Sequence, residues 1–409
     1  MNKKLEAFYG LPNEVKFCKK CVISNQRPNS TVEFKNEKGE KKSVINFNEE
    51  GICSACLFNE EKERKIGWEQ RDKKLRELLA RFRSSDGSYD VIVPGSGGKD
   101  SAFTAHILKY KYGMNPLTVT WAPHLYTDIG WKNMQEWMHT GGLDNILYTP
   151  NGKLHREMTK NAFHNLLHPF QPFIVGQRII GPVMAKKFGV KLVMYGENQA
   201  EYGNAIEENT NPIMNMDFFS SQNALEMKFG GISMQEYIDQ GTYTKDDFAP
   251  YIAPDRQELI DAGVEVHYLG YYLKWDPQEC YYYAVDNTGF EANETRTEGS
   301  FSKYSSIDDK VDPFHYYTTL IKFGIGRCTY DAAQEIRNDK ITREEAAYLV
   351  KKYDTEFPHK YFHEFLEYID SSKDEFFETI DKHRSPHIWK KVDDEWKLRH
   401  TVNCDGTDD

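Results

Sequence analysis

The chain has 409 residues, 39% of them hydrophobic and 28% charged, which is enough for two or three domains with hydrophobic cores. It contains no apolar run of about eighteen residues, so the sequence predicts no membrane-spanning helix. The formal net charge of −11 disfavours nucleic acid as a partner, because polyanion binding depends on a basic surface. Lys3 and Lys4 are followed by Leu5–Tyr9 and not by an apolar signal region, so we expect a cytoplasmic protein.

Two Cys-x-x-Cys pairs lie near the start of the chain, Cys18 with Cys21 and Cys53 with Cys56. Each pair places two thiolates on one tight turn, and two such turns complete a tetrahedral site of the closed, structural kind. We therefore predict a zinc-ribbon-like module over residues 1–65. Iron–sulfur ligation and a redox Cys-x-x-Cys are the alternatives, while two disulfides are disfavoured in a reducing cell.

The segment between the two pairs has the pattern of a hairpin. The polar run Asn36–Glu40 separates Val32–Phe34 from Val44–Phe47, as a turn separates two strands. After the second pair, residues 60–83 form a charged amphipathic pattern that predicts one helix. We assign residues 66–88 to a linker helix between the cysteine module and the next domain.

Short β-rich runs alternate with helical patterns through the middle of the chain. The predicted strands are 90–93, Pro116–Trp121, Asn145–Tyr148, Val190–Tyr195 and Val264–Leu269. This alternation predicts an α/β fold with a doubly wound parallel sheet covered by helices on both faces. Ligands of such sheets bind beyond the carboxyl ends of the strands, where the loops carrying Ser96, Trp121 and Glu197 emerge.

The first predicted strand leads directly into a glycine-rich turn and a helix. Glycines let the backbone approach a bulky anion, and the unpaired N–H groups that open a helix carry partial positive charge, so this arrangement favours phosphate. The common phosphate loop does not fit, because Val93 stands where it needs glycine and Asp100 where it needs Ser or Thr. The run S-G-G-K-D-S at residues 96–101 instead resembles the pyrophosphate loop of the PP-loop ATP pyrophosphatase superfamily.

That resemblance implies a reaction and a set of roles. Members of the superfamily split ATP between its α and β phosphates, hold the pyrophosphate in this loop and leave AMP on a substrate oxygen. Lys99 and the backbone N–H groups are expected to stabilise the pyrophosphate, while Asp100, with Glu197 or Glu201, holds magnesium. These four side chains are the predicted catalytic residues. The predicted nucleotide contacts are Gly95, Ser96, Gly97, Gly98, Lys99, Asp100, Ser101, Trp121, Arg178 and Asn198.

A second motif follows the fourth predicted strand. Gly196-Glu197-Asn198-x-x-Glu201 is similar to a superfamily motif that in many members reads Gly-His-Asn with an acid nearby, and Glu197 replaces the histidine. Arg178 precedes the strand in a region where relatives often keep an arginine for phosphate or adenylate, although an arginine on a helix is commonly solvated. Adenine is expected to lie near Trp121.

The second half of the chain completes the predicted organisation. We assign residues 89–275 to the ATP-binding domain, with 204–254 as a lid or an inserted packing segment, and 276–409 to a substrate-facing loop and a helical C-terminal region. The hydroxyl-rich and charged run at 298–310 suits a polyhydroxylated, anionic small molecule, or a hydrogen-bonded loop without a ligand. Thr342-x-x-Glu345 is a capping box that predicts the start of a helix.

Most of the chain resembles one narrower family. The paired Cys-x-x-Cys, the S-G-G-K-D-S loop and the runs at 120–124, 149–152, 195–198 and 323–331 are similar to the N-acetyl sugar amidotransferase family of bacterial surface-polysaccharide and flagellin-glycan pathways. The resemblance implies conversion of an acetamido group on a sugar into an acetamidino group, with ATP, magnesium and zinc as cofactors. It also implies partners, a glutaminase and a subunit resembling the cyclase of histidine biosynthesis, that deliver ammonia.

Two alternatives remain open from the sequence. A tRNA-thiolating or other sulfur-inserting enzyme also combines a pyrophosphate loop with cysteine pairs, although the acidic balance disfavours tRNA. A non-catalytic nucleotide-binding subunit would use the cysteine module for docking, although intact Lys99 and Asp100 speak against it.

Overall fold

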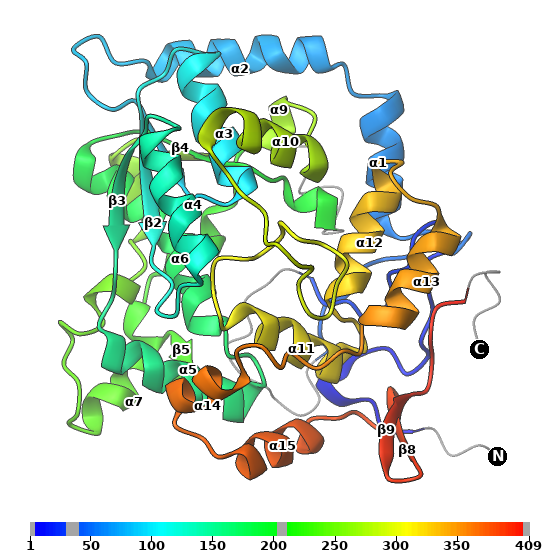
Figure 1. The fold of residues 1–409 in the computed structure, drawn as a ribbon. Coiled ribbons are helices and arrows are strands. Elements are labelled where there is room, and N and C mark those ends of the chain that lie inside the picture. The colour runs from blue at the N-terminus through cyan, green and yellow to red at the C-terminus, as the bar shows by residue number, and fades with distance from the viewer. Residues whose placement is uncertain (1–4, 30–40, 203–210, 404–409) are drawn as a thin grey trace.

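The computed structural model describes residues 5–29, 41–202 and 211–403 (Figure 1). The predicted hairpin turn Asn36–Glu40, the strand Val32–Phe34 before it and the start of the 204–254 segment lie outside the described residues. Within the described ranges, none of the helices combines the length and the apolar character needed to cross a membrane.

A five-stranded parallel sheet forms the centre of the molecule, in the order β3-β2-β1-β4-β7. Its strands are β1 (Val91–Pro94), β2 (Pro116–Trp121), β3 (Asp144–Tyr148), β4 (Leu192–Tyr195) and β7 (Glu265–Tyr268). Valine, isoleucine and leucine fill the central strands because both faces of a parallel sheet are covered. The predicted strands and the parallel α/β fold are confirmed.

Helices connect the strands and cover both faces of the sheet. They are α3 (Lys99–Tyr110), α4 (Asp128–His139), α5 (Gly152–Leu166), α6 (Gln171–Phe188) and α8 (Arg256–Asp261), and the short α9 (Leu269–Tyr272) follows the last strand. Because such crossovers are right-handed, α3 and α6 cover opposite faces, and both contact the central strands. The strand order reverses between β1 and β4, which opens a crevice at the carboxyl ends of these two strands.

The region expected to form one helix over 60–83 contains two. Helix α1 (Ser54–Arg64) ends before Gly67, and α2 (Trp68–Phe82) begins after it. Gly67 has an extended backbone at the start of α2, and glycine is a poor residue for a helix interior, so the helix is interrupted there. The single-helix prediction is wrong, but Leu75, Leu78 and Leu79 are buried as their spacing predicts.

The described part of the 204–254 segment is a compact set of short elements. They are η4 (Met216–Phe218), η5 (Ala224–Glu226), the hairpin β5–β6 (Lys228–Phe229, Ile232–Ser233), α7 (Met234–Asp239) and η6 (Ala249–Tyr251). Phe229, Tyr237 and Phe248 are fully buried in the same hydrophobic core as the sheet. Burial of these rings fixes the segment against the domain, and a lid function stays a prediction.

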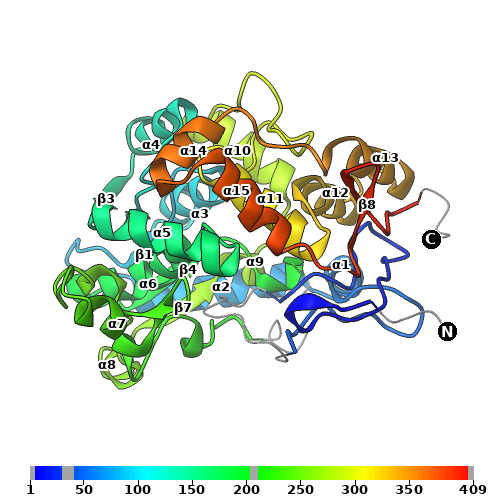
Figure 2. The same cartoon turned by 90° about the horizontal axis from the view of Figure 1, so that it is seen from below.

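The C-terminal region is helical and ends in a hairpin. Its elements are α10 (Pro277–Thr288), α11 (Asp312–Phe323), α12 (Arg327–Arg337), α13 (Arg343–Tyr353), α14 (Phe362–Ile369), α15 (Lys373–Lys382), β8 (Trp389–Val392) and β9 (Glu395–Leu398). The capping box of Thr342 and Glu345 is present at the start of α13. Figures 1 and 2 show α12 and α13 beside the N-terminal cysteine module, with which they share a hydrophobic core.

Candidate active site and metal centre

The glycine-rich turn between β1 and α3 has the geometry of an anion-binding loop. Gly97 has φ of +80°, and a Cβ on it would lie 3.0 Å from the backbone oxygen of Asn133. A Cβ on Gly95 would lie only 2.1 Å from that of Ser101. The N–H groups in the first turn of α3 have no intrahelical partner, as at the start of any helix, and no described side chain caps them. The loop therefore needs its glycines and offers free donors to an anion.

Lys99 and Asp100 lie at the start of α3 and are held by a tryptophan. The ammonium of Lys99 is 2.5 Å from Oδ2 of Asp100, and Lys99 is only 7% exposed. The indole Nε1 of Trp275 donates a hydrogen bond of 3.1 Å to Oδ1 of Asp100. Burial lowers the pKa of Lys99, but the carboxylates of Asp100 and Glu197 outweigh it and raise the pKa above its ordinary value. Lys99 thus stays charged at the edge of the cavity.

Glu197 follows β4 and meets Asp100 across the crevice. The pKa of Glu197 is raised to about 8, chiefly by burial and then by the Asp100 carboxylate, while Lys99 and a hydrogen bond to Tyr202 oppose the shift. The Glu197 and Asp100 side chains hydrogen-bond to each other, which places two acidic groups side by side. Such a pair can share one proton or hold a divalent cation.

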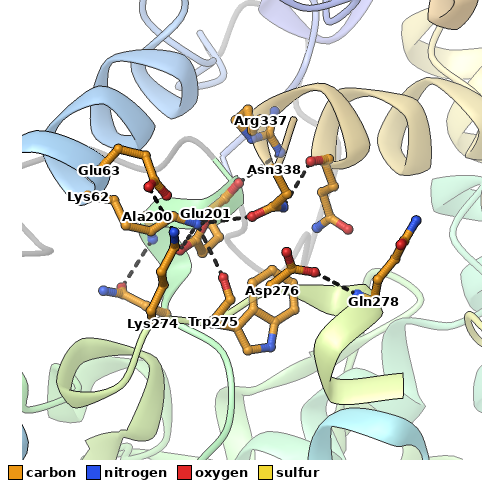
Figure 3. Close-up of polar contacts among 12 residues, drawn as sticks. Lys62, Glu63, Ala200, Glu201, Lys274, Trp275, Asp276, Gln278, Arg337 and Asn338 are labelled. Atoms are coloured by element: carbon orange, nitrogen blue, oxygen red, sulfur yellow. Dashed lines mark hydrogen bonds and ion pairs between the residues drawn. The ribbon is translucent and has the colours of Figure 1, made fainter. Parts of the chain in front are cut away.

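Glu201, the other predicted acid of this motif, lies elsewhere. Both of its carboxylate oxygens are 3.1 Å from the ammonium of Lys62, and both residues are buried (Figure 3). The η2 turn (Gln199–Tyr202) directs Glu201 toward α1, and Glu201 is not among the residues that line the cavity beside the phosphate loop. The structure therefore brings Glu197 to Asp100 and pairs Glu201 with a lysine.

The predicted nucleotide contacts outside the loop divide into two groups. Trp121 lines the cavity at 2% exposure, and its indole N–H has no hydrogen-bond partner among the described residues. Arg178 of α6 is half-buried in the same cavity wall, with its guanidinium 5.6 Å from the centre of the Phe218 ring. Asn198 is buried, and its Oδ1 accepts a hydrogen bond of 3.2 Å from the N–H of Ala200. Trp121 and Arg178 face the cavity, whereas Asn198 shapes the turn.

The cavity beside the loop has a volume of about 1420 Å³. Ligand pockets usually measure about 300 to 1,000 Å³, so this one has room for more than a single nucleotide. The phosphate loop, Trp121 and residues 304–309 all line this cavity. Two substrates can therefore meet in one cavity.

A buried arginine organises the part of the cavity lining that residues 304–309 form. Arg327, in the 323–331 run, is 2% exposed and lies 3.0 Å from Oδ2 of Asp312. Its Nη2 donates a 2.5 Å hydrogen bond to the carbonyl of Ser305. Burial raises the pKa of Asp312 to about 6, while Arg327 opposes the rise. These contacts fix the hydroxyl-rich loop against α11 and α12, so the loop presents its polar groups to the cavity in a defined conformation.

The four N-terminal cysteines form a closed cluster. The sulfurs of Cys18 and Cys56 are 3.9 Å apart, those of Cys21 and Cys53 are 3.7 Å apart, and all four lie within 4.8 Å of one another. A tetrahedral ion with Zn–S bonds of about 2.3 Å places its sulfurs about 3.8 Å apart. Backbone N–H groups, including that of Cys53 at 3.3 Å, donate to the sulfur of Cys18. The donor set fits a single metal ion such as zinc.

This geometry also bears on the iron–sulfur alternative. In a four-iron cluster each thiolate binds a separate iron atom, so the cluster holds the sulfurs farther apart than 3.7 Å. The four thiols, all buried, fit a mononuclear site better.

Sequence reasoning missed two residues that hold the acidic pair, Trp275 and Tyr202. Trp275 follows β7 and reaches Asp100 from a distance of 175 residues in the chain. Its position after the carboxyl end of a strand next to β4 was the available signal, because the loops at this edge meet over the crevice. Tyr202 adjoins the second motif, and no spacing rule marks it.

Two sequence comparisons find relatives of parts of the chain. Residues 298–403 match the family model described as LPS biosynthesis protein WbpG-like, C-terminal domain. An uncharacterized protein of Methanocaldococcus jannaschii is 35% identical over 78 residues, which are 19% of this chain and 27% of that protein. The chain thus spans about a quarter of the length of this curated relative.

A comparison with solved structures finds matches that include two synthetases and a thiolase. The NH3-dependent NAD synthetase from Campylobacter jejuni is 15% identical, with a TM-score of 0.27 over 34% of this chain and 59% of that one. NMN synthetase from Francisella tularensis is 12% identical, with a TM-score of 0.30 over 74% and 97%. The U34-tRNA thiolase NcsA from Methanococcus maripaludis, solved with its 4Fe–4S cluster, is 13% identical, with a TM-score of 0.31 over 78% and 89%.

The sheet order, the loop after β1 and the family match agree with the expected architecture. The chain has an α/β fold with a parallel five-stranded sheet, a four-cysteine cluster near its N-terminus and a helical C-terminal region. That region carries the WbpG-like domain, so the predicted resemblance is confirmed at this level.

Proposed function

We propose that this chain, which joins a WbpG-like C-terminal domain to a PP-loop type α/β domain, is an ATP-dependent sugar amidotransferase. It adenylates the acetamido oxygen of an N-acetylated sugar and replaces this oxygen with ammonia, giving an acetamidino sugar, AMP and pyrophosphate. One observation carries the proposal: the S-G-G-K-D-S loop opens at the sheet crevice into the same cavity as the hydroxyl-rich loop of the C-terminal domain.

The proposed reaction has two steps. The acetamido oxygen first attacks the α phosphorus of ATP, and the bond to the bridging oxygen breaks so that pyrophosphate leaves. Ammonia then adds to the activated carbon, the C–O bond breaks, and AMP departs with the former amide oxygen. An amide carbon is a poor electrophile, so adenylation supplies the leaving group that ammonia requires.

The residues of the loop suit the first step. The free N–H groups at the start of α3 and the ammonium of Lys99 would stabilise the charge that develops on pyrophosphate. Asp100 and Glu197 lie together on the same side of the loop and would hold magnesium, which neutralises phosphate charge when bound. Glu201 is paired with Lys62 and is not needed for this role.

The part of the cavity lined by residues 304–309 would bind the sugar. Ser305, Ser306, Asp308 and Asp309 line the cavity there, and hydroxyl and carboxylate groups suit the hydroxyls of a sugar. Trp121, with its unpartnered indole donor, supports placement of adenine against the end of β2. By the resemblance of the whole chain, a partner glutaminase and a histidine-cyclase-like subunit would supply ammonia, and the four-cysteine site would hold zinc.

The sulfur-inserting alternative is less well supported. Burial raises the pKa of Cys280, the cysteine beside Asp100 and Lys99, well above its ordinary value, so its thiol is poorly suited to carry sulfur as a thiolate. The mononuclear geometry of the four N-terminal thiols also gives no support to an iron–sulfur cofactor. A non-catalytic subunit would not need the charged set of Lys99, Asp100 and Glu197.

Product analysis tests the proposal. The purified chain is incubated with ATP, magnesium, ammonium and a panel of N-acetylated sugars, and the phosphorus products and sugar masses are measured. We expect AMP and pyrophosphate together with a sugar lighter by about one mass unit, since C=NH replaces C=O. ADP with orthophosphate, or sulfur incorporation into tRNA, would overturn it.

A further inference from the structure

Lys62 places a fully buried ammonium between three segments that are distant in the sequence. Lys62 is 1% exposed, and besides Glu201 it contacts the backbone oxygen of Trp275 at 3.2 Å and Oδ1 of Asn338 at 3.4 Å (Figure 3). A buried ion pair gives little net stability, because desolvation offsets the attraction of the charges. The arrangement therefore calls for an explanation other than stability.

Each main partner of Lys62 also supports one member of the acidic pair. Trp275, whose carbonyl accepts from Lys62, donates its indole N–H to Asp100 at 3.1 Å. Glu201 adjoins Tyr202, whose hydroxyl hydrogen-bonds to Glu197. A single ammonium thus fixes both the residue that holds Asp100 and the turn that holds Glu197.

The other end of this connection is the four-cysteine cluster. Lys62 lies on α1, the helix that begins directly after Cys53 and contains Cys56 in its first turn. Arg337 of α12 reinforces the link, because it donates a 3.0 Å hydrogen bond to the backbone oxygen of Glu201, and α12 packs in the same hydrophobic core as the four cysteines. The position of α1, and so of Lys62, depends on the cysteine pairs that anchor it.

We infer that Lys62 is a positioning residue through which the four-cysteine cluster holds Asp100 and Glu197 in place over the phosphate loop. This inference rests on the proposed function, because it assigns Lys62 a role toward the acids of that same site. The four-cysteine cluster then contributes to the reaction through α1 and one buried ion pair, without contacting either substrate. Partners that orient a metal-binding group typically change metal affinity or activity by about 10- to 100-fold when they are removed.

A pair of variants separates positioning from stability. Lys62→Met leaves Glu201 as an unpaired buried acid, so both the thermal midpoint and the turnover number should fall. The double variant Lys62→Met with Glu201→Met replaces the ion pair by apolar side chains, which is often neutral or stabilising. We expect the double variant to recover the thermal midpoint while its turnover number stays about 10- to 100-fold low.

A matched control lies between the same two segments of the chain. Lys274 pairs with Glu63 of α1 at 2.8 Å on the surface, next to the buried pair (Figure 3). Lys274→Met removes a lysine contact between α1 and the segment before α10, and we expect wild-type turnover because exposed pairs contribute little.

A second measurement does not depend on turnover. Magnesium affinity in the presence of ATP is measured by calorimetry, and we expect the double variant to bind magnesium about 10-fold more weakly while metal-free ATP binds as in the wild type. Recovery of both turnover and magnesium affinity in the double variant would overturn the inference. If the wild type forms no AMP with any sugar, the proposed function fails, and the magnesium titration alone then decides the role of Lys62.

Discussion

The four-cysteine cluster and the phosphate loop are both built from short motifs, but they face opposite environments. At the cluster, four buried thiols face one another, and backbone N–H groups donate hydrogen bonds to the sulfur of Cys18. At the loop, N–H donors, Lys99 and two acids face a large cavity, and Glu197 keeps a strongly raised pKa. A closed site with complementary ligands stabilises a fold, whereas an open site with unmatched charge is prepared for a ligand.

The largest effect that would sharpen this comparison is the loss of the metal from the four-cysteine cluster. Structural zinc contributes apparent binding energies of about 10 to 16 kcal/mol in small domains, so its removal should strongly destabilise the N-terminal module and the α12–α13 pair that shares its core. Thermal unfolding is followed after chelation and after zinc is restored, with zinc-saturated chelator as the control. An unchanged midpoint in protein shown to be metal-free would contradict a structural role.

The next largest effect concerns the loop itself. Lys99→Met should lower turnover by about 10²- to 10³-fold, because a positioned donor to developing charge is removed, while the thermal midpoint stays near that of the wild type. Steady-state formation of pyrophosphate and thermal unfolding are measured together. Lys111→Met, an exposed change at the end of α3, serves as the control. If Lys99→Met lowered the thermal midpoint and left the turnover number unchanged, the phosphate loop would stabilise the fold and not serve the reaction, which would contradict this account.

A smaller effect depends on pH through Glu197. Its folded pKa of about 8 lies above its ordinary value of 4.5, so magnesium must displace a proton below pH 8. Magnesium affinity should therefore rise about 10-fold between about pH 7 and about pH 9, as measured by calorimetry.

The raised pKa of Glu197 also affects the stability of the metal-free fold. The protonated carboxyl stabilises this fold at low pH, and the stabilisation is lost as the pH rises toward 8. Glu197→Gln should remove both dependences, and a flat profile in the wild type would exclude Glu197 as a ligand.

The smallest effect lies beside the closed site. Thr342→Ala removes the side-chain cap of α13, a helix that packs in the same core as the cysteine module. We expect a loss of about 1 kcal/mol in the free energy of unfolding and no change in turnover. Denaturant titration and the pyrophosphate assay measure the two quantities. A fall in turnover without a loss of stability would show that this region acts on the reaction by a route other than packing.

Both motif sites could be predicted from the sequence because their chemistry is local. The spacing of Cys18 and Cys21, and of Cys53 and Cys56, fixes two turns whatever the rest of the chain does. The run at residues 96–101 likewise combines turn, helix start and charge within six positions. The sheet followed from β-rich runs separated by helices, as its five parallel strands confirm.

The contacts that join the two sites were not predictable in the same way. Lys62 and Glu201 are 139 residues apart, and a lysine on a charged helix normally faces solvent. The resemblance to a superfamily motif offered Glu197 or Glu201 as the acid that holds magnesium with Asp100, but the two carboxylates have different partners, because the η2 turn places Glu201 beside Lys62. Long-range ion pairs depend on tertiary packing, which no spacing rule encodes. The predicted domain bounds and the roles of the individual site residues stay predictions.

The path of one oxygen atom tests the central claim most directly. An N-acetylated sugar that the chain converts is labelled with heavy oxygen in its acetamido group and incubated with ATP, magnesium and ammonium, and AMP and pyrophosphate are examined by mass spectrometry. Adenylation of the acetamido group predicts that the label appears in AMP and is absent from pyrophosphate. Label that stays in the sugar, or that appears in orthophosphate, would contradict the account.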